Sequence, residues 1–207
     1  MKIVPIEYGK SYLPESMIFS GGDKQKTRDI VFKIYLIGTD EKFILVDSGC
    51  ETMPGFEMRD FIGPIKALQN AGISPDQITD VVITHSHHDH IECVGCFKNA
   101  AVHIQKEEYE SGRSYISPEQ KVNIFDDEYE ICDGVKVIKI GGHSKGSCIV
   151  EIDCQNKKYI ISGDECYLRE CLLKKIPTGS SFCPEKSKEF TEKYSTEEYE
   201  VLLCHDN

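Results

Sequence analysis

The 207-residue chain has no tryptophan, no long hydrophobic run and a shortage of positive charge. Without tryptophan it lacks the usual best aromatic platform for a bound cation. No stretch approaches about 18 consecutive apolar residues, so a membrane span is not expected. Residues 1–20 also lack the apolar core of a signal peptide, so we expect the protein to stay in the cytoplasm.

The shortage of positive charge narrows the class of partner. The chain has 24 Lys and Arg against 35 Asp and Glu, which gives a formal net charge of −11. Such a chain would repel a phosphate backbone and an anionic membrane surface. We therefore expect a small-molecule substrate, with no nucleic acid and no membrane as partner, for a chain that acts as a monomer or a homodimer.

Length and composition are those of an ordinary globular protein. The 207 residues, of which 40% are hydrophobic and 29% charged, suit one domain over residues 1–207 with a substantial core. Ten cysteines are unusual. Because a signal peptide is missing, we expect most of them to be small buried residues in a reducing compartment. The spacing of Cys93 and Cys96 leaves a redox or metal pair open as an alternative.

Apolar and β-branched runs alternate with helix-like segments along the chain. The runs at 31–37 and 42–46 predict a hairpin. Further strands are predicted at 80–84, 101–105, 135–140, 147–152, 158–161 and 198–204, and helices at 61–71, from 106–110 onward, and at 184–194. Ser74 and Pro75 predict a short capped helical turn. This mixture of elements predicts an α/β or α+β sandwich.

The most informative segment follows the predicted buried strand at 80–84. It contains four of the chain's seven histidines within six positions. Residues two apart on an extended strand end point the same way, so His85 and His87 can bind one ion. Asp89 and His90 lie just beyond, where the chain turns into a helix, and can reach a second ion. Imidazole and carboxylate are ligands that zinc accepts, so this segment predicts a metal site.

Three later residues could complete two metal sites. His143 lies in a glycine-rich turn between two predicted strands, Asp164 follows the strand at 158–161, and His205 follows the last strand. Taken singly, each is better explained as an ordinary turn residue. Taken with the histidine cluster, they supply the missing ligands in number and type. We therefore predict a site for two divalent metal ions.

The order of these motifs resembles that of a known family. Thr-His-Ser-His-His-Asp-His at 84–90, Gly-His-Ser-Lys-Gly-Ser at 142–147, Ser-Gly-Asp at 162–164 and a late His205 are similar to the motifs of the metallo-β-lactamase-fold hydrolases. The segment Leu-Val-Asp-Ser-Gly at 45–49 resembles that family's first motif. The resemblance implies an α+β fold, a four-layer αββα sandwich of the metallo-β-lactamase type.

By the same resemblance, the metal ligands fall into two groups that share one carboxylate. One ion would be bound by His85, His87 and His143, the other by Asp89, His90 and His205, with Asp164 bridging both. Asp47 would orient a ligand by a hydrogen bond, whereas His88 would not be a ligand and His103 would be structural. Zinc is the first expectation, with iron or manganese as alternatives, because sites of His and Asp accept all three.

The predicted ligands indicate hydrolysis. Two cations that flank a water lower its pKa toward neutrality, and the resulting bridging hydroxide attacks an electrophilic carbonyl or phosphorus. One metal also polarises the oxygen that takes up charge. No serine or cysteine nucleophile is needed, and the sequence has no Gly-x-Ser-x-Gly elbow.

The residues after Asp164 suggest a substrate class. Tyr167, three positions later, resembles a tyrosine of the N-acyl-homoserine lactonase branch that contacts the substrate carbonyl and helps ring opening. The alternative is that Tyr167 only packs under the site. Asp89 and Tyr167 are therefore the candidate catalytic residues. The segment 11–29 also resembles that branch's loop beside the acyl chain.

Other functions stay open at this stage. A thioesterase or phosphodiesterase of the same fold would use the same metals, and the ten cysteines favour a non-catalytic metal or redox sensor. Lys145 and Glu92 depart from the family's pattern, but neither replaces a ligand. All seven predicted ligands are present, which favours catalysis. The sequence therefore predicts a dinuclear metal-dependent hydrolase of a lactone or a related small ester, with an N-acyl-homoserine lactone-like substrate as the first expectation.

Overall fold

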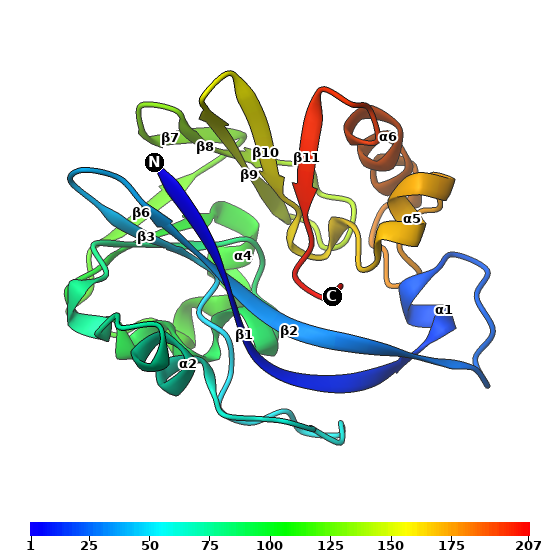
Figure 1. Ribbon diagram of the computed structural model, residues 1–207, viewed down its shortest axis with the longest axis horizontal. Coiled ribbons are helices and arrows are strands. Elements are labelled where there is room, and N and C mark those ends of the chain that lie inside the picture. The colour runs from blue at the N-terminus through cyan, green and yellow to red at the C-terminus, as the bar shows by residue number, and fades with distance from the viewer. The chain divides into compact units, whose positions relative to one another are not determined.

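The computed structural model describes residues 1–207 (Figure 1). The chain divides into two compact units, and each of them contains two stretches of sequence. Unit 1 comprises Met1–Ser11 and Val31–Phe125, and unit 2 comprises Tyr12–Ile30 and Asp126–Asn207. A six-stranded sheet belongs mainly to unit 1 and a five-stranded sheet to unit 2, and helices accompany both, as in the predicted α+β class.

The strands of the six-stranded sheet follow the order of the sequence. They are β1 (Lys2–Pro14), β2 (Thr27–Gly38), β3 (Phe43–Val46), β4 (Asp80–Ile83), β5 (Ala101–Gln105) and β6 (Val122–Phe125). β2 and β3 form the predicted antiparallel hairpin, whereas β3 to β6 are parallel. All four residues of β4 are buried, which explains the apolar sequence of its last three. Because parallel strands end at the same edge, the residues that follow β3 and β4 lie close together.

Short helices connect these strands. They are α2 (Pro64–Asn70), η1 (Pro75–Gln77), α3 (His88–Ile91), η2 (Glu92–Cys96), α4 (Lys106–Gly112) and η3 (Arg113–Tyr115). The helix predicted at 61–71 begins only at Pro64, so its predicted start is wrong. Gly63 has a φ of 77°, and a residue before proline is kept out of the helical region. The predicted cap before η1 is confirmed, because the Ser74 side chain accepts a hydrogen bond from the amide of Asp76.

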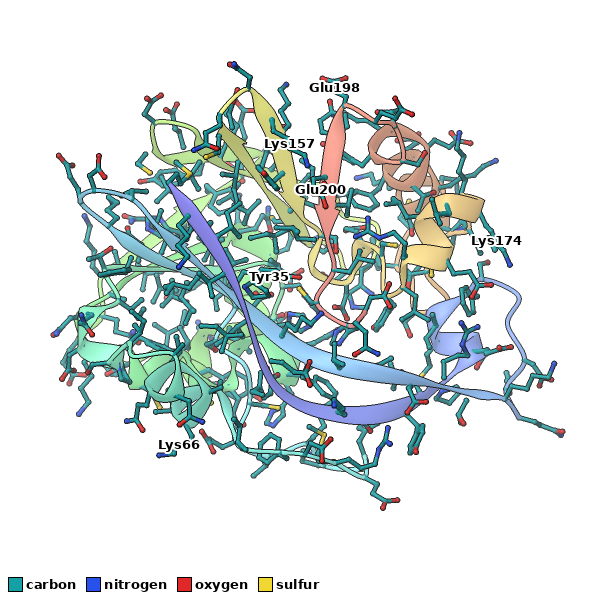
Figure 2. All side chains as sticks on the ribbon, in the orientation of Figure 1. Tyr35, Lys66, Lys157, Lys174, Glu198 and Glu200 are labelled. Carbon is teal, nitrogen blue, oxygen red and sulfur yellow. The ribbon has the colours of Figure 1, made fainter.

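The sheet of unit 2 has the strand order β11-β10-β9-β8-β7. Its strands are β7 (Glu128–Cys132), β8 (Val135–Lys139), β9 (Cys148–Cys154), β10 (Lys157–Ile161) and β11 (Tyr199–Leu202). Only β10 and β11 pair in parallel. Lys157 and Glu200 form an ion pair of 2.6 Å across these two strands (Figure 2). Both side chains are exposed and screened by water, so burial rather than this ion pair stabilises the sheet.

Unit 2 also contains α1 (Glu15–Ile18), η4 (Gly163–Glu165), α5 (Arg169–Lys174) and α6 (Pro184–Tyr194). Helix α6 has the predicted bounds and starts with proline, which a first helical position tolerates. Phe190 and Tyr194, one turn apart, are both buried, and the Tyr194 ring lies 4.9 Å from that of Tyr199 on β11. Figure 1 shows α5 and α6 next to β11. The face of α6 that carries these aromatic rings therefore packs against the sheet.

The predicted strands β5, β8, β9, β10 and β11 are confirmed to within two residues at each end. Strands β1, β6 and β7 and helix α5 were not predicted. β1 contains Pro5 and Gly9, two residue types that argue against a strand in a sequence. No helix combines the length and the apolar character needed to cross a membrane.

Candidate metal centre

The predicted donors of unit 1 begin in the turn after β4. His85 is fully buried, and its Nε2 lies 3.1 Å from Nδ1 of the exposed His87. Two nitrogens that bind one tetrahedral zinc ion at about 2.0–2.1 Å are roughly 3.3 Å apart. The spacing of these two histidines therefore gives their ring nitrogens a separation that suits one ion.

Asp89 and His90 follow in helix α3. The ring of the buried His90 lies 4.1 Å from the ring of His85, between centroids. Asp89 Oδ2 lies 3.6 Å from His90 Nε2. The hydroxyl of the buried Tyr8 donates a hydrogen bond of 3.0 Å to the main-chain carbonyl of Asp89, which ties down this helical turn. All four predicted donors of unit 1 thus lie within one turn of chain.

Asp47, which follows β3, orients the same turn through its carboxylate. One oxygen accepts from the Thr84 amide at 2.8 Å, and the other from the Thr84 hydroxyl at 2.9 Å and from His90 Nδ1 at 2.7 Å. A histidine that donates from Nδ1 has Nε2 as its lone-pair nitrogen, and a carboxylate partner is the common device that orients metal-binding imidazoles. The hydrogen bond that the resemblance implied for Asp47 is present.

Glu108 of helix α4 also contacts the histidine turn, the segment His85–His90. Its buried carboxylate accepts hydrogen bonds from the amide of Ser86 at 2.8 Å and from the hydroxyl of Ser86 at 2.6 Å. Ser86 separates His85 from His87, so these bonds hold the main chain between the two histidines. Glu108 was not predicted, because in the sequence it is one acidic residue among several on a polar helix.

The three predicted donors of unit 2 are distant in sequence but adjacent in space. His143, Asp164 and His205 are all buried. Asp164 Oδ1 lies 2.9 Å from His205 Nε2, and Asp164 Oδ2 lies 3.6 Å from His143 Nε2. One carboxylate therefore faces two imidazoles, one through each oxygen, which is the arrangement that a bridging ligand requires.

Two further groups hold His143. Its Nδ1 donates a hydrogen bond of 2.6 Å to the carbonyl of Ser180, which orients the imidazole. Its amide donates to the carboxylate of Glu165 at 3.3 Å. Burial raises the pKa of Glu165 to about 7, although hydrogen bonds from Ser147 and from the main chain oppose this rise. Neither group was predicted: a carbonyl has no sequence signal, and in the sequence Glu165 is only a second acidic residue directly after Asp164.

Tyr167 lies against both histidines of unit 2. Its ring stacks on His205, with centroids 5.0 Å apart and an interplanar angle of 19°, and meets His143 edge-on at 6.0 Å. Only 5% of its surface is exposed. The position of the ring is therefore compatible with both predictions for Tyr167, a packing role and a catalytic role.

The remaining histidines of unit 1 have partners outside the donor cluster. His88 Nε2 lies 2.8 Å from the carbonyl of Thr52, and His103 Nε2 lies 2.8 Å from the carboxylate of Asp80. Asp80 and His103 lie on β4 and β5, within the sheet. These contacts agree with the expectation that His88 is not a ligand and that His103 is structural.

All ten cysteines are free thiols. Six are buried, which confirms that most of them act as small core residues: Cys50, Cys93, Cys148, Cys166, Cys171 and Cys204. Burial raises the pKa of both Cys93 and Cys96. Because the thiolate is the reactive form, a raised pKa argues against a redox function for this pair.

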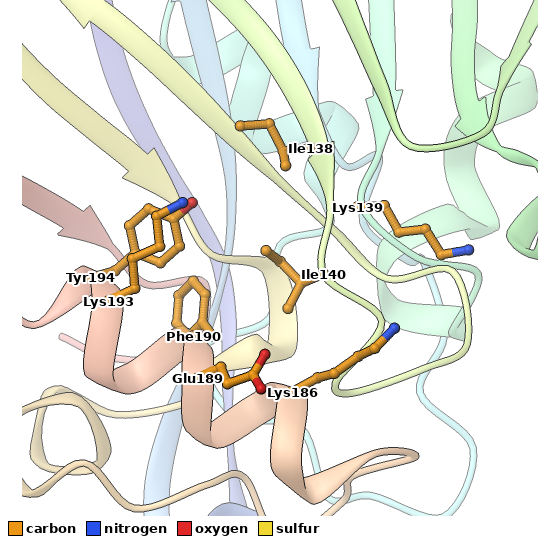
Figure 3. Close-up of a pocket in the computed structure, with 8 residues that line it drawn as sticks. All are labelled: Ile138, Lys139, Ile140, Lys186, Glu189, Phe190, Lys193 and Tyr194. Carbon is orange, nitrogen blue, oxygen red and sulfur yellow. The ribbon is translucent and has the colours of Figure 1, made fainter.

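A pocket of about 280 Å³ lies in unit 2 between α6 and the end of β8 (Figure 3). Its lining combines apolar and charged side chains: Ile138, Lys139, Ile140, Lys186, Glu189, Phe190, Lys193 and Tyr194. None of these is a predicted site residue, and the lining contains neither histidine nor aspartate. This pocket is therefore separate from the donors described above.

The predicted donors of each unit have the chemistry of ligands for divalent metal ions. They consist only of imidazoles and carboxylates, the ligands of zinc and of the neighbouring transition metals. Three of the imidazoles have Nδ1 within hydrogen-bond distance of an oxygen: His85 at Thr84, His90 at Asp47 and His143 at Ser180. Metal-binding histidines are commonly oriented in this way.

Comparison with known proteins agrees with this chemistry. The pattern of the metallo-beta-lactamase superfamily matches residues 33–189. An N-acyl homoserine lactonase of Bacillus thuringiensis is 25% identical over an alignment that covers 99% of this chain and 93% of that protein. A solved N-acyl homoserine lactone hydrolase, with the product N-hexanoyl-L-homoserine at its catalytic metal centre, is 24% identical, with a TM-score of 0.84 over 99% of this chain and 93% of the other. The dizinc quorum-quenching lactonase AidC is 18% identical, with a TM-score of 0.81 over 99% and 87%.

The matched residues 33–189 include every predicted donor except His205. The similar structures span almost the whole chain. They confirm the metallo-β-lactamase type of fold that the order of the motifs predicted. The chain belongs to the metallo-beta-lactamase superfamily and is a lactonase-like metallo-hydrolase of that fold.

Proposed function

We propose that the protein hydrolyses a lactone of the N-acyl-homoserine lactone type, the substrate class of quorum-quenching enzymes, with a related small ester as the nearest variant. The observation that carries this proposal is the placement of Asp164, whose two carboxylate oxygens face His143 and His205 separately. A shared carboxylate is what a dinuclear hydrolytic site needs. The names of the similar proteins supply the substrate class, because they are N-acyl homoserine lactonases.

The ligand sets that we propose combine donors of both units. By the family resemblance, the first ion would take His85, His87 and His143, the second would take Asp89, His90 and His205, and Asp164 would belong to both. On this proposal the two units act as one domain over residues 1–207, because neither unit alone supplies enough protein ligands for two ions. His85 and His87 of unit 1 would give the first ion only two nitrogens.

Zinc is the metal that we propose for both positions. Histidine and aspartate suit zinc, and a similar structure is a dizinc lactonase. Iron and manganese remain the alternatives, since the same donors bind them and their selection depends on availability. When bound, the ions supply Lewis-acid polarisation of the carbonyl and a water of lowered pKa.

The side chains of the chain itself orient the substrate and move protons. Asp89 is partly exposed and lies 3.6 Å from His90 Nε2, so its carboxylate can bind the second ion through one oxygen and accept a proton at the other. The hydroxyl of Tyr167 can donate to the oxygen that gains charge when the ring opens. Its ring is fixed by His205 and His143, so the hydroxyl needs no reorganisation during the reaction.

Of the two alternative functions, one is compatible with the same donors and the other is disfavoured. A thioesterase or phosphodiesterase would use the same donors, because both thioester carbonyls and phosphodiesters are attacked by water at dinuclear sites. A non-catalytic redox sensor is disfavoured by the raised pKa values of Cys93 and Cys96. The substrate that we propose is a small molecule, handled by a monomer or a homodimer.

The experiment that tests the proposal combines metal analysis with a proton-release assay. Opening a lactone yields a carboxylic acid, which releases one proton near neutral pH. N-hexanoyl-homoserine lactone, a thioester and a phosphodiester are offered to the purified protein, with and without a chelator. We expect two metal ions per chain, fastest turnover of the lactone and loss of activity with chelator. Two metal ions with turnover of only the thioester or the phosphodiester would contradict the substrate class, and absence of metal would contradict the site.

A further inference from the structure

Glu165, to which the sequence analysis assigned no function, is fully buried next to Asp164. One of its oxygens, Oε1, accepts three hydrogen bonds from a single turn of unit 2. The donors are the amide of Gly142 at 3.1 Å, the amide of His143 at 3.3 Å and the hydroxyl of Ser147 at 2.5 Å. The carboxylate thus holds the main chain at and just before a predicted metal ligand, and the side chain of Ser147 after it.

A buried glutamate lowers the stability of a protein core. A buried carboxylate loses its hydration, and a single unpaired oxygen adds to the penalty. Glu165 Oε2 is buried and has no hydrogen-bond partner. An apolar side chain would fill the same space without this penalty. The stability of the fold alone therefore does not account for a glutamate at this position.

Gly142 is adapted to the glutamate. A Cβ atom at Gly142 would lie 2.3 Å from Glu165 Oε2 and 2.8 Å from the amide nitrogen of Ser187. Any larger residue would push the carboxylate or helix α6 away. The turn therefore has a glycine where the carboxylate must come close to the main chain.

The three hydrogen bonds join two turns that carry different donors. The turn between β8 and β9 carries His143, and η4 after β10 carries Asp164. Because Glu165 is the next residue after Asp164, its bonds to the other turn constrain the gap between the two donors. That gap is 3.6 Å, from His143 Nε2 to Asp164 Oδ2.

We infer that Glu165 is a positioning residue that sets the affinity of the site for metal. It holds His143 at a distance from Asp164 at which both side chains can bind the same ion, and Ser147 assists it. The inference rests on the proposed metal centre. It needs only contacts within unit 2. Ser180 orients the imidazole through Nδ1, whereas Glu165 fixes the main chain from which the imidazole projects.

Two substitutions of Glu165 separate positioning from a merely structural role. Glu165→Gln keeps an oxygen that accepts from Gly142, His143 and Ser147, but places an amide where Oε2 has no partner. We expect it to be less stable and yet to bind metal within about threefold of the wild type. Glu165→Ala removes the acceptor, and we expect metal affinity to fall by about 10- to 100-fold, the usual effect of losing a residue that orients a ligand.

Ser147→Ala and Asp80→Asn complete the set. Ser147→Ala removes one of the three donors, so a loss of about two- to fivefold in metal affinity is expected. Asp80→Asn changes a buried, hydrogen-bonded carboxylate on β4 of unit 1 that contacts no predicted ligand. It should lower stability and leave metal affinity unchanged, which controls for a general effect of losing a buried carboxylate.

The measurement is a titration of the metal-free full chain with cobalt(II), followed by its visible absorption spectrum and by competition with a chelator. The inference predicts weaker binding and an altered cobalt spectrum for Glu165→Ala, and a spectrum close to the wild type for Glu165→Gln. Wild-type affinity and spectrum in Glu165→Ala would overturn it. If Glu165→Ala does not fold, unchanged cobalt affinity in Ser147→Ala would overturn it instead. A wild-type chain that binds no cobalt would contradict the proposed metal centre itself, which is a different result.

Discussion

The two units provide their donors in opposite ways. Unit 1 provides His85, His87, Asp89 and His90 from one turn after a single strand, whereas unit 2 provides His143, Asp164 and His205 from three separate turns. In unit 1 the spacing along the chain already determines which side chains meet. In unit 2 only the order of β9, β10 and β11 in the sheet brings the donors together. A local motif thus shows which predicted donors meet in unit 1, whereas sheet topology is needed to show it in unit 2.

The groups that hold the donors differ in the same way. In unit 1 two carboxylates, Asp47 and Glu108, bond to the histidine turn. In unit 2 a main-chain carbonyl, that of Ser180, orients His143, and Glu165 bonds to main-chain amides. The unit 1 donors are therefore supported mostly by side chains and the unit 2 donors mostly through the main chain. Substitutions should affect the two halves unequally.

The largest effect is expected from Asp164→Ala, which removes the carboxylate proposed to serve both ions. We expect both ions to be lost and lactone turnover to fall by at least about a thousandfold, because the substitution removes the one side chain that is proposed to bind both ions. Metal analysis and the proton-release assay check this. Full activity with two ions retained would contradict the bridging assignment.

Asp47→Asn should affect mainly the unit 1 half. The oxygen that accepts from His90 Nδ1 and from the Thr84 hydroxyl becomes an amide or is turned away. Metal affinity is expected to fall by about 10- to 100-fold, with one ion lost before the other. Stepwise removal by a chelator, followed by metal analysis, measures the order. Simultaneous loss of both ions would mean that Asp47 affects the binding of both ions equally.

Tyr167→Phe should leave the metals in place and slow the reaction. The ring contacts with His205 and His143 remain, and only the hydroxyl is lost. We expect kcat to fall by about 10-fold or more with unchanged metal content, as for other groups that stabilise developing charge. An unchanged kcat would leave Tyr167 with its packing role alone.

Asp80→Asn tests whether a buried carboxylate far from the predicted donors stabilises the fold. Asp80 lies at the start of β4, whereas the predicted donors follow its end. Burial alone would raise the pKa of Asp80, but hydrogen bonds from His103, Lys42 and Thr79 outweigh it and lower the pKa from 3.8 to about 2. A lowered pKa stabilises the folded state above pH 4 and loses this effect as the pH falls through 2. The contribution at pH 7 is about 2 kcal/mol, of which about half is gone by pH 3.

Urea unfolding of the wild type and Asp80→Asn from pH 7 to pH 3 checks that prediction. The difference in the free energy of unfolding should shrink as the pH falls, while metal affinity near pH 7 stays the same in both proteins. A difference that does not change with pH would mean that the charge of Asp80 does not stabilise the fold.

The sequence indicated candidate donors but not the groups that surround them. The periodicity of strands and the clustering of His85 to His90 depend on neighbours in sequence, so both were accessible. The order of the motifs then indicated the family. β1 was missed because Pro5 and Gly9 break its pattern, although pairing with β2 overrides that local preference. Ser180 could not be predicted because it acts through its main-chain carbonyl, which every residue has. Glu165 could not be predicted because its contact with Gly142 joins residues more than 20 positions apart in the sequence.

The most direct test of the central claim is a crystal structure with anomalous diffraction measured at the zinc edge. The account predicts two ions per chain, each bound by donors of both units, with Asp164 bound to both. It also predicts His143 bound through Nε2 and His87 through Nδ1. Ions bound by only one unit, or a single ion that Asp164 does not contact, would contradict the claim that two differently built halves complete one centre.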